Sequence, residues 1–512
     1  MSPRIFRKTG IIMEEAIQKL DAFFNPRAVA VIGATKGKGK AGAIIFENFV
    51  KNKLRGVFKG ELYPINPKEE ELSGFKCYKT LSEVPGDVDL IVVIVPSGAV
   101  AGVLEEAGGK KTKAAVIISA GFKEVGNHEL EEQVIAVAKK HGIRVLGPNC
   151  LGVFYAKTGV DSVFLPEFKT LSTGKEVIAT PRPISGNIAM ITQSGAFGSA
   201  ALDYLAGRQM GVSKFVSFGN KCDASESDIL EYLLEDEETH VVLIYLEDIK
   251  SGKDFLRVAK KVSLKKPIVI IKSGRSEAGA RAAASHTGAI AGADKIYDAA
   301  FEKTGVIRAK NMNEFFIIGK ALVSMKPSVG SNIGILTDAG GPGVMCVDEC
   351  ETVGLTVNKF SEPTLKKFEE LKENGQILKI AATYNPVDLT GSVIDDQFVV
   401  SADLMFQEPT ISGIIFLGLH HMPGLQETYI TGVAEVAAKY DKPIVACDIG
   451  ETEMALYTRD HFDRLGLPAY SSPEDAAHAM KALLQYGSFL QKNGALEAYI
   501  AEYNKRKAAT KQ

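Results

Sequence analysis

The sequence predicts an α/β protein with three consecutive doubly wound domains, and three observations lead to this prediction. Short runs rich in Val and Ile alternate with helical segments along most of the chain, which is typical of parallel strands joined by crossover helices. These runs end in turns of Gly, Pro, Asn or Ser. A chain of 512 residues with 46% hydrophobic content is also long enough to form several separate cores.

The first predicted domain spans residues 14–150. Its strands are the apolar runs at 28–32, 61–65, 90–94, 115–118 and 144–146. The run that begins at Leu90 is much shorter than the roughly 20 residues that a membrane span needs, so we expect it to be a buried strand.

Two further domains follow a connecting segment at 151–185, where several prolines interrupt the pattern and a hairpin is expected. The second domain spans 186–312, with strands predicted at 188–191, 214–217, 241–245 and 268–271. The third domain spans 325–490, with strands predicted at 333–336, 414–417 and 443–446. Ligands of such sheets bind at the carboxyl ends of the strands, so the residues after each strand are the candidate functional residues.

Charge, cysteine spacing and the length of the apolar runs argue against nucleic-acid binding, membrane association and metal binding. The net charge of −2 gives no support for a nucleic-acid or membrane-surface partner held by bulk electrostatics. Of the six cysteines only Cys346 and Cys350 lie close together, without a histidine beside them to complete a metal site. The sequence shows neither a signal-peptide core nor a membrane span. We therefore expect a cytoplasmic protein with reduced thiols and no metal site.

The turn after the first strand favours a phosphate-bearing ligand. Residues 33–40 offer backbone amides, three lysines and the N-terminus of the following helix. The glycines at 37, 39 and 42 spell GxGxxG, but they begin too far beyond the strand for a dinucleotide fingerprint.

The turns after the next strands agree with this interpretation. Residues 66–68 read Asn-Pro-Lys, where an NAD-binding protein would place an acid against the ribose. The small residues at 96–97 and 119–121 would let an extended ligand lie close to the backbone. Ordinary turn chemistry is the alternative for all of these positions.

In the second domain, residues 193–198 directly follow one strand and precede a helix. We expect Ser194 to cap that helix, whose amides and dipole could hold a phosphate; a capping serine without a ligand is the alternative. Another strand ends beside Glu247 and Asp248. A carboxylate there could bond one imidazole nitrogen and leave the other nucleophilic. We expect Glu247 to do so, with Asp248 as the rival and a solvated pair of acids as the alternative.

The segment 274–289 places one histidine, His286, among Ala, Gly, Ser and Thr. A large share of its imidazole is neutral at cytoplasmic pH, so a ring nitrogen is free to attack a phosphoryl group. The alternative is a solvated histidine in a flexible turn.

Several of these motifs together resemble the α subunit of ADP-forming acyl-CoA synthetases, in the superfamily of succinyl-CoA synthetase. The resemblance covers about residues 20–485 and rests on the segments 33–35, 64–68, 193–198, 272–275, 285–288, 338–343 and 385–391. It implies that the first domain is a Rossmann-like CoA-binding domain and that the second and third domains are flavodoxin-like.

The resemblance also implies the roles of individual residues. His286 matches the phosphohistidine and Glu247 the glutamate that steadies it, while Ser194 and Gly195 match the phosphate-binding helix start. The implied CoA contacts are Gly33, Ala34, Thr35, Lys36, Asn66, Pro67, Lys68, Pro96, Ser97, Ser119, Ala120 and Gly121.

The activity that this implies is the reversible conversion of acyl-CoA, ADP and phosphate to a carboxylic acid, CoA and ATP. After residue 312 there is room for one α/β unit and a helix, but not for the two-lobed ATP-grasp module of the superfamily. We therefore expect a separate ATP-grasp β subunit, in an α2β2 assembly, that binds most of ATP or ADP with Mg²⁺. A non-catalytic CoA-binding regulatory or scaffold protein and an NAD-dependent dehydrogenase are the alternatives.

Overall fold

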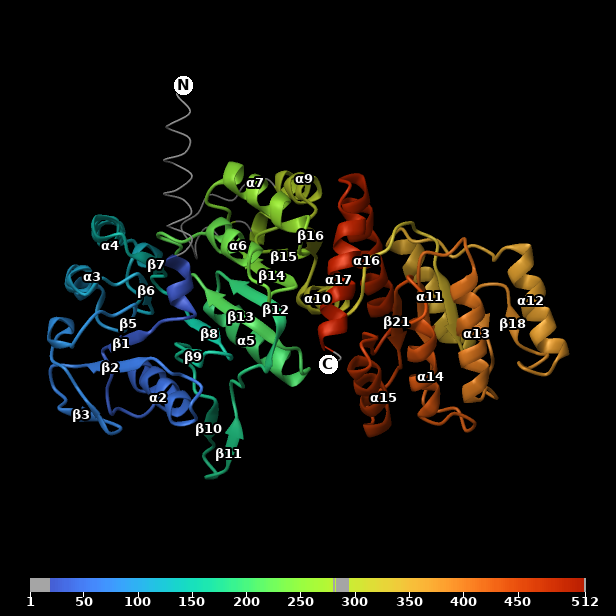
Figure 1. Cartoon of the computed structure of the whole chain (residues 1–512), viewed down its shortest axis with the longest axis horizontal. Helices are drawn as coiled ribbons and strands as arrows, with labels where there is room; N and C mark the ends of the chain where they lie inside the picture. Colours follow the sequence, from blue (N-terminus) through green and yellow to red (C-terminus); the bar gives the residue numbers. More distant parts are fainter. Residues whose placement is uncertain (1–18, 280, 282–293, 511–512) are drawn as a thin grey trace, which may run out of the picture. The chain divides into compact units, whose positions relative to one another are not determined.

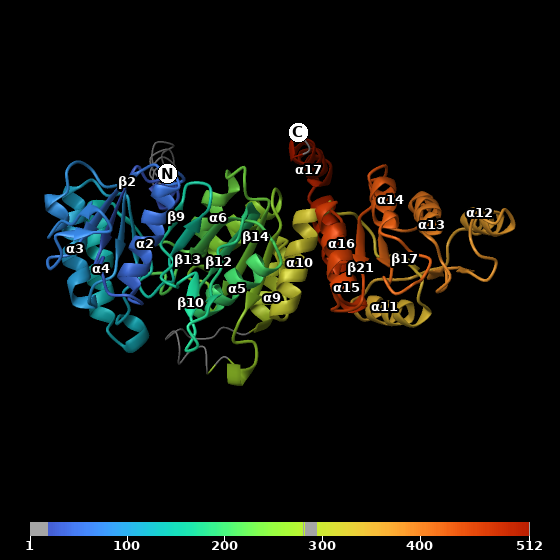
Figure 2. The same ribbon diagram turned by 90° about the horizontal axis from the view of Figure 1, so that it is seen from below.

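The computed structural model describes residues 19–279, 281 and 294–510, and the chain divides into two compact units, Met1–Arg308 and Ala309–Gln512 (Figure 1, Figure 2). Two large sheets belong mainly to the first unit and one to the second. All three are built around parallel strands with helices between them, which confirms the predicted α/β class.

The first sheet has the strand order β2-β1-β5-β6-β7, and all its strands are parallel. The strands lie within a residue of the predicted runs: β1 (Ala28–Ile32), β2 (Glu61–Ile65), β5 (Leu90–Val93), β6 (Ala114–Ile117) and β7 (Arg144–Leu146). Its helices are α2 (Ala41–Leu54), α3 (Ser97–Gly109) and α4 (His128–His141). A small hairpin, β3 (Glu71–Leu72) with β4 (Phe75–Lys76), and the 3₁₀ turns η2 (Leu81–Glu83) and η3 (Lys123–Val125) complete the domain.

The strand β1 shows why this sheet is covered on both faces. Val29 and Val31 belong to the hydrophobic cluster that contains the apolar side chains of α2. Ala30 and Ile32 belong to the cluster that contains those of α3 and α4. Alternate side chains of a strand point to opposite faces, so a strand of five apolar residues needs helices on both sides. In Figure 1, α2 and the pair α3 and α4 lie on opposite sides of the sheet.

The second sheet has the order β16-β15-β14-β12-β13-β8-β9. Its central strands match the predicted runs: β12 (Ser185–Thr192), β13 (Val212–Ser217), β14 (Val241–Leu246) and β15 (Ile268–Lys272), with β16 (Ile307–Ala309) at one edge. The helices are α5 (Gly195–Gly207), α6 (Glu226–Leu234), α7 (Gly252–Ser263) and α9 (Asp294–Thr304). The cluster on the α2 side of the first sheet continues into residues of β12, β14, α6 and α7.

The predicted connecting segment 151–185 contributes more structure than the sequence indicates. The hairpin is β10 (Phe168–Thr170) with β11 (Glu176–Ile178). In addition, β8 (Val153–Tyr155) and β9 (Val160–Asp161) add two antiparallel strands to the second sheet. Strands of two or three residues are too short to show a period, which is why the pattern missed them.

The second unit contains the third sheet, of order β18-β19-β17-β20-β21-β22. The three longer strands were predicted: β17 (Gly334–Thr337), β20 (Ile414–Leu417) and β21 (Ile444–Cys447). Three strands were missed because they span only two residues: β18 (Ala382–Thr383), β19 (Val387–Asp388) and β22 (Ala469–Tyr470). Its helices are α10 (Met312–Ser324), α11 (Gly340–Thr352), α12 (Glu362–Glu373), α13 (Asp395–Gln407), α14 (Thr428–Ala437), α15 (Glu453–Arg464), α16 (Pro473–Lys492) and α17 (Leu496–Thr510).

All three sheets share one topological feature that decides where a ligand can bind. The first parallel strand of each sheet lies between the second and third parallel strands, so the chain reverses its direction of winding beside that strand. The switch points lie between β1 and β5, between β12 and β14, and between β17 and β20. Crossover helices on opposite faces leave a crevice at such a point, outside the carboxyl ends of the strands.

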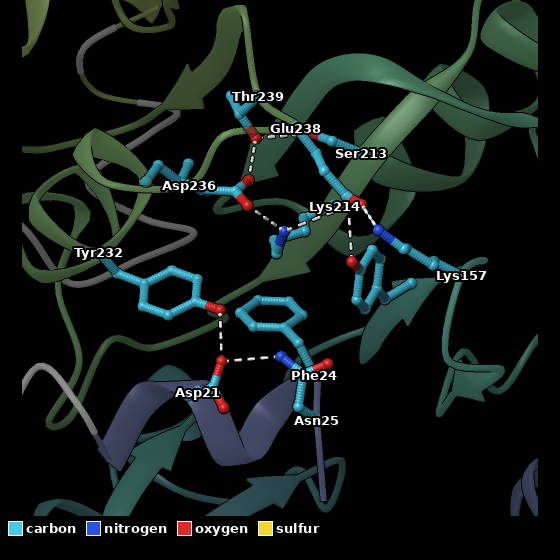
Figure 3. Close-up of polar contacts among 12 residues, drawn as sticks. Asp21, Phe24, Asn25, Lys157, Ser213, Lys214, Tyr232, Asp236, Glu238 and Thr239 are labelled. Atoms are coloured by element: carbon cyan, nitrogen blue, oxygen red, sulfur yellow. Dashed lines mark hydrogen bonds and ion pairs between the residues drawn. The ribbon is translucent and has the colours of Figure 1, made fainter. Parts of the chain in front are cut away.

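A buried ionic cluster fastens the start of the described chain to the second sheet (Figure 3). Lys214 on β13 is 2% exposed, and its Nζ lies 2.8 Å from the carboxylate of Asp236. The same ammonium lies over the rings of Tyr155 and Phe24. Phe24 directly follows the 3₁₀ turn η1 (Lys19–Phe23). The cation therefore joins three segments that are distant in sequence.

No helix in the described parts of the chain is long and apolar enough to cross a membrane. All six cysteines are buried and unpaired. Burial raises the pKa of the Cys150 thiol to about 12, so this thiol stays protonated and unreactive at neutral pH.

Candidate active site

The start of α5 lies at the switch point of the second sheet. Ser194 caps this helix as predicted, because its side-chain oxygen accepts a hydrogen bond from the backbone N–H of Phe197 at 3.2 Å. Gly198 lets the helix pack tightly onto β12, since a Cβ there would lie 2.8 Å from the methyl group of Thr192. The first amides of the helix, including that of Gly195, therefore meet the edge of the sheet together with the positive end of the helix dipole.

Gln193 joins this helix start to the neighbouring strand β14. Its side-chain oxygen accepts hydrogen bonds from the backbone amides of Glu247, at 2.9 Å, and Asp248, at 3.3 Å. Its side-chain nitrogen donates to the Asp248 carboxylate at 2.5 Å. The residues that follow β12 and β14 are thus held together across the switch point.

Asp248 is bound in turn by a buried lysine. The Nζ of Lys221 lies 2.8 Å from the Asp248 carboxylate and 3.2 Å from the carboxylate of Glu226, which is fully buried. Burial alone would raise the pKa of Asp248, but the charge of Lys221 and the hydrogen bonds from Lys221 and Gln193 hold it below its usual value. The Asp248 carboxylate therefore stays ionised and acts only as a hydrogen-bond acceptor.

Aromatic rings lie beside this edge of the sheet. The ring of Phe197 stacks on that of Tyr245 with 4.3 Å between the ring centroids. Lys272, at the end of β15, lies with its Nζ 4.6 Å from the centre of the Tyr297 ring and donates to the carbonyl of Ser273. Burial lowers the pKa of Lys272, although the nearby carboxylates, foremost Asp294, oppose this effect.

A second set of contacts connects this edge to the first domain. The Asn220 amide nitrogen donates to Glu124 at 2.7 Å and to Glu131 at 2.9 Å. Glu124 in turn accepts a hydrogen bond from the backbone N–H of Gly121, one of the predicted CoA contacts. Asn220 directly precedes Lys221, which pairs with Asp248. The turn after β6 is therefore connected to Asp248 through Glu124, Asn220 and Lys221.

The predicted nucleophile, His286, lies outside the described residues. Glu247 lies one residue beyond the end of β14, at the carboxyl edge of the sheet where the sequence placed it. Gln193 and Lys221 were not among the predicted site residues, although both lie in turns that follow strands at this edge. The signal for Gln193 was its position directly after β12; nothing in the sequence marks Lys221 as a buried charge.

The predicted CoA region contains a cavity of about 290 Å³ at the switch point between β1 and β5. Gly33, Asn66, Pro67 and Pro96 line it, as members of the predicted set. Lys79, Thr80, Leu81 and Glu106 also line the cavity, and they were missed because they follow no strand of the main sheet. The remaining predicted contacts do not line this cavity: Ala34, Thr35, Lys36, Lys68 and Ser97 lie next to the lining turns, and Ser119, Ala120 and Gly121 lie in the turn after β6.

Two helices begin in this part of the domain without a side-chain cap among the described residues, one at the cavity itself and one beside Gly33. They are α2, which starts after Lys40, and α3, which starts after Pro96. Uncapped helix starts present backbone amides and a partial positive charge, which suits the phosphates of CoA.

Gly33 and Gly42 make this close arrangement possible. Gly33 has φ +94°, and a Cβ on it would lie 2.1 Å from the carbonyl oxygen of Ile94. A Cβ on Gly42 would lie 2.1 Å from the carbonyl oxygen of Gly33. Gly42 therefore brings α2 against the end of β1, and Gly33 brings that end against the residues after β5, whereas a Cβ at Gly39 would meet no atom within 4 Å.

Several predicted contact residues have an observed role in shaping the turns. The Asn66 amide donates to the carbonyl of Ala34 at 2.7 Å, and its side-chain oxygen accepts from the amide of Lys68. The Ser119 hydroxyl donates to the carbonyl of Val95 at 2.6 Å. Lys36 pairs with Glu69 at 3.1 Å. These bonds fix the walls of the crevice.

The third sheet places its own polar residues at the carboxyl edge. Asp338, after β17, accepts a hydrogen bond from the backbone N–H of Leu419 at 3.0 Å. Burial raises its pKa to about 7. His420 pairs through Nδ1 with the fully buried Asp448 at 2.8 Å. In the second sequence motif of this domain, the Asn385 amide bonds the carbonyls of Ile333 and Asn358, which makes it a connector of loops.

No group of three or more His, Cys, Asp or Glu side chains in the described ranges is arranged to hold a metal ion. Among the carboxylates at the edges of the sheets, Asp248 pairs with Lys221, Asp338 accepts from a backbone amide and Asp448 pairs with His420. The arrangement of the first two sheets suits a phosphate-bearing ligand.

Models of known families match the three sheets in order. Residues 27–156 match a CoA binding domain, residues 185–322 a succinyl-CoA ligase like flavodoxin domain, and residues 333–486 a ligase-CoA domain. The match over residues 185–322 agrees with the flavodoxin-like interpretation of the second domain.

Characterised relatives are similar over nearly the whole chain. The α subunit of the ADP-forming acetate–CoA ligase I of Pyrococcus furiosus is 39% identical over 485 residues, covering 93% of this chain and 99% of the relative. The ADP-forming acetate–CoA ligase of Methanocaldococcus jannaschii is 38% identical over 466 residues, and the chain covers 62% of its length.

A solved structure has the same fold. The dinucleotide-forming acetyl-coenzyme A synthetase 1 of Ca. Korarchaeum cryptofilum, in complex with phosphate and ADP, superposes with a TM-score of 0.82 at 37% identity. The match covers 93% of this chain and 98% of that one. The chain therefore belongs to the α subunits of the ADP-forming acyl-CoA synthetases.

Proposed function

We propose that the chain forms ATP from acyl-CoA, ADP and phosphate in a reversible reaction that passes through an acyl phosphate and a phosphohistidine at His286. The observation that carries this proposal is the position of the capped start of α5 and of Glu247 at the ends of neighbouring strands, at one switch point. An anion site and a carboxylate for an imidazole are the two groups that phosphoryl transfer to a histidine requires.

The reaction divides into three displacements. A phosphate oxygen attacks the thioester carbon, the carbon–sulfur bond breaks, and CoA leaves as the thiol. A nitrogen of His286 then attacks phosphorus, and the carboxylate leaves. Finally a terminal oxygen of ADP attacks the same phosphorus, the phosphorus–nitrogen bond breaks, and ATP forms. In the first two steps, the amides of the α5 start stabilise the charge on the transferring group.

Glu247 is a better partner for His286 than Asp248 is. The Asp248 carboxylate already receives the ammonium of Lys221 and the amide of Gln193. Turning it toward an imidazole would leave the buried charge of Lys221 without this partner, which is costly. Glu247 takes part in neither of these two bonds through its side chain, so we assign to it the stabilisation of the phosphoimidazolium.

CoA is the ligand we assign to the crevice between β1 and β5. The uncapped starts of α2 and α3 and the cavity lined by Gly33 and Pro96 support this assignment. Asn66 occupies the position where an NAD-binding protein has an acid, and it is already bonded to the carbonyl of Ala34. The site thus disfavours a dehydrogenase, and the similarity to catalytic α subunits disfavours a non-catalytic scaffold.

A separate partner subunit would supply the nucleotide site. The Pyrococcus relatives are named α subunits, whereas the Methanocaldococcus relative carries further residues beyond the match on one chain. We propose an ATP-grasp β subunit, in an α2β2 assembly, that binds ADP or ATP with Mg²⁺. The substrate class is a carboxylic acid; the names of relatives include acetate, 4-hydroxybutyrate and trans-feruloyl-CoA.

Labelling of the reconstituted complex tests the function. The chain with its β subunit is incubated with ATP labelled at the γ-phosphate, or with acyl-CoA and labelled phosphate. We expect a protein-bound label that is stable to base and labile to acid, and that is absent from His286→Ala. A label that survives this substitution would refute the proposal. A panel of acyl-CoA substrates with the same complex then identifies the acid.

A further inference from the structure

We infer that Gln193 is a positioning residue that holds Glu247 at the carboxyl edge of the second sheet. The side-chain amide of Gln193 does so through hydrogen bonds, and Asp248 with Lys221 sets which end of the amide donates and which accepts. This inference rests on the proposed role of Glu247. Gln193 itself touches no reacting group in this assignment; it acts through the backbone of the residue that does. The relevant contacts all lie within the first unit.

The amide of Gln193 has one orientation that satisfies its neighbours. The side chain of Gln193 faces two backbone N–H donors just after β14, of Glu247 and Asp248, and one carboxylate acceptor, of Asp248. The amide oxygen must face the donors, and the amide nitrogen must face the carboxylate. A side chain with this mixture of donor and acceptor is what the end of β14 requires.

The Asp248 carboxylate, which accepts the hydrogen bond from Gln193, is held in place by an ion pair. Asp248 pairs with Lys221, whose side chain is 3% exposed, and Lys221 also donates to the backbone carbonyl of Asp248 at 2.8 Å. Glu226 completes the cluster, accepting from Lys221 and from the backbone N–H of Lys250. Because Asp248 and Glu226 already share the ammonium of Lys221, another negative charge beside Asp248 would be repelled by an existing carboxylate.

Gln and Glu have nearly the same shape, but at position 193 they should affect Glu247 very differently. In Gln193→Glu the amide nitrogen becomes a carboxylate oxygen, which would face the Asp248 carboxylate across a distance that is now 2.5 Å. Repulsion would turn the new side chain away from β14, and the amide of Glu247 would lose its partner. The Glu247 carboxylate would then no longer be held at its position, although the fold and the CoA crevice would be preserved.

The same logic predicts a compensating change. In Asp248→Asn the side chain at 248 can turn its nitrogen toward position 193. Combined with Gln193→Glu, this restores one donor facing one acceptor, with the direction of the bond reversed. The introduced carboxylate can then again accept from the backbone amide of Glu247. A residue that merely fills space would not show such a rescue.

The test is a double-mutant cycle on the complete complex with its β subunit. Single-turnover rates of phosphohistidine formation are measured for the wild type, Gln193→Glu, Asp248→Asn and the double variant. We expect Gln193→Glu to slow this step on the order of 10- to 100-fold, as for a misplaced catalytic group, with the dissociation constant of CoA unchanged. We expect the double variant to be about tenfold faster than the product of the single effects predicts.

Gln133→Glu is the matched control, because it makes the same chemical change at an exposed position of α4. It should leave the rate unchanged. A wild-type rate in Gln193→Glu, or simple multiplication of the single effects in the double variant, would overturn the inference. Glu247→Gln separates this outcome from failure of the proposed function: if Glu247→Gln also leaves phosphorylation unchanged, the role of Glu247 is wrong and not only that of Gln193.

Discussion

The carbonyl oxygen of Gly33 passes so close to the Cα of Gly42 that a Cβ on Gly42 would lie 2.1 Å from it. The end of β1 and the first turn of α2 are therefore in backbone contact. Because α2 begins without a side-chain cap at the crevice that we propose for CoA, this contact would set the distance between the helix amides and a phosphate of CoA.

Gly42→Ala is predicted to impair CoA binding. The added methyl group must push α2 away from β1, since the atom it meets belongs to the backbone. We expect a weaker affinity for CoA in isothermal titration calorimetry and a lower unfolding temperature. Gly102→Ala in α3 is the control, because a Cβ there meets no atom within 4 Å and alanine favours a helix by about 1 kcal/mol. Equal affinities for CoA in the two variants would contradict the prediction.

Loss of the Ser194 cap is predicted to affect both stability and phosphorylation. Ser194→Ala removes the acceptor of the Phe197 amide and should destabilise the protein by about 0.5–2 kcal/mol. It should also lower the rate of phosphohistidine formation, because the helix start is the proposed anion site. Asn311→Ala removes an equivalent cap from α10 and should reduce stability alone. If both variants phosphorylate at the same rate, the anion site is not at α5.

Lys214 is predicted to be essential for the stability of the first unit. Lys214→Met leaves the largely buried carboxylate of Asp236 without its cation, which should cost about 3–5 kcal/mol in urea-induced unfolding. Lys157, which pairs with Glu238 from an exposed position, provides the comparison (Figure 3). Lys157→Met should cost less than about 1 kcal/mol. Similar losses for both variants would show that burial does not govern these pairs.

Asp338 is predicted to make the second unit less stable as the pH rises. Its pKa in the folded chain is about 7, above the ordinary value of 3.8, because it is buried near Asp448 and Asp388. The folded state therefore holds a proton that the unfolded state has released between about pH 4 and pH 7. The unfolding free energy must fall as the pH rises through this window, by up to about 4 kcal/mol.

Asp338→Asn removes this titration and retains an acceptor for the Leu419 amide. The variant should be more stable than the wild type at pH 8, and the difference should shrink toward pH 5. Thermal unfolding followed at both pH values measures this directly. A stability difference that is the same at pH 5 and pH 8 would contradict the raised pKa.

Much of the fold could be predicted from the sequence because its strands are buried on both faces. The run at residues 28–32 is apolar throughout, and it forms β1 with no change of boundary. Strands of two residues, such as β9 and β19, carry no periodicity and were missed. The switch points could not be read from the sequence, because strand order depends on which crossover helices cover which face.

The candidate site was predicted in part. Ser194 could be identified because capping is local: the serine, the strand before it and the helix after it are consecutive in sequence. The pairing of Lys221 with Asp248 could not be predicted, since the two residues lie 27 positions apart and no local pattern distinguishes a buried lysine from a solvated one. Lys79 and Thr80 were missed for the same reason, because only folding brings them to the cavity beside Gly33.

The sequence by itself determined the α/β class, the positions of the long strands, the cap at Ser194 and the family resemblance, all of which depend on local periodicity or on short motifs. The tertiary structure decided that Gln193 bonds the backbone of Glu247, that Asp248 pairs with Lys221, and that Gly42 lies against Gly33. Each of these contacts joins separate elements of the fold. Their geometry follows from strand order and helix packing, which no short stretch of the chain specifies.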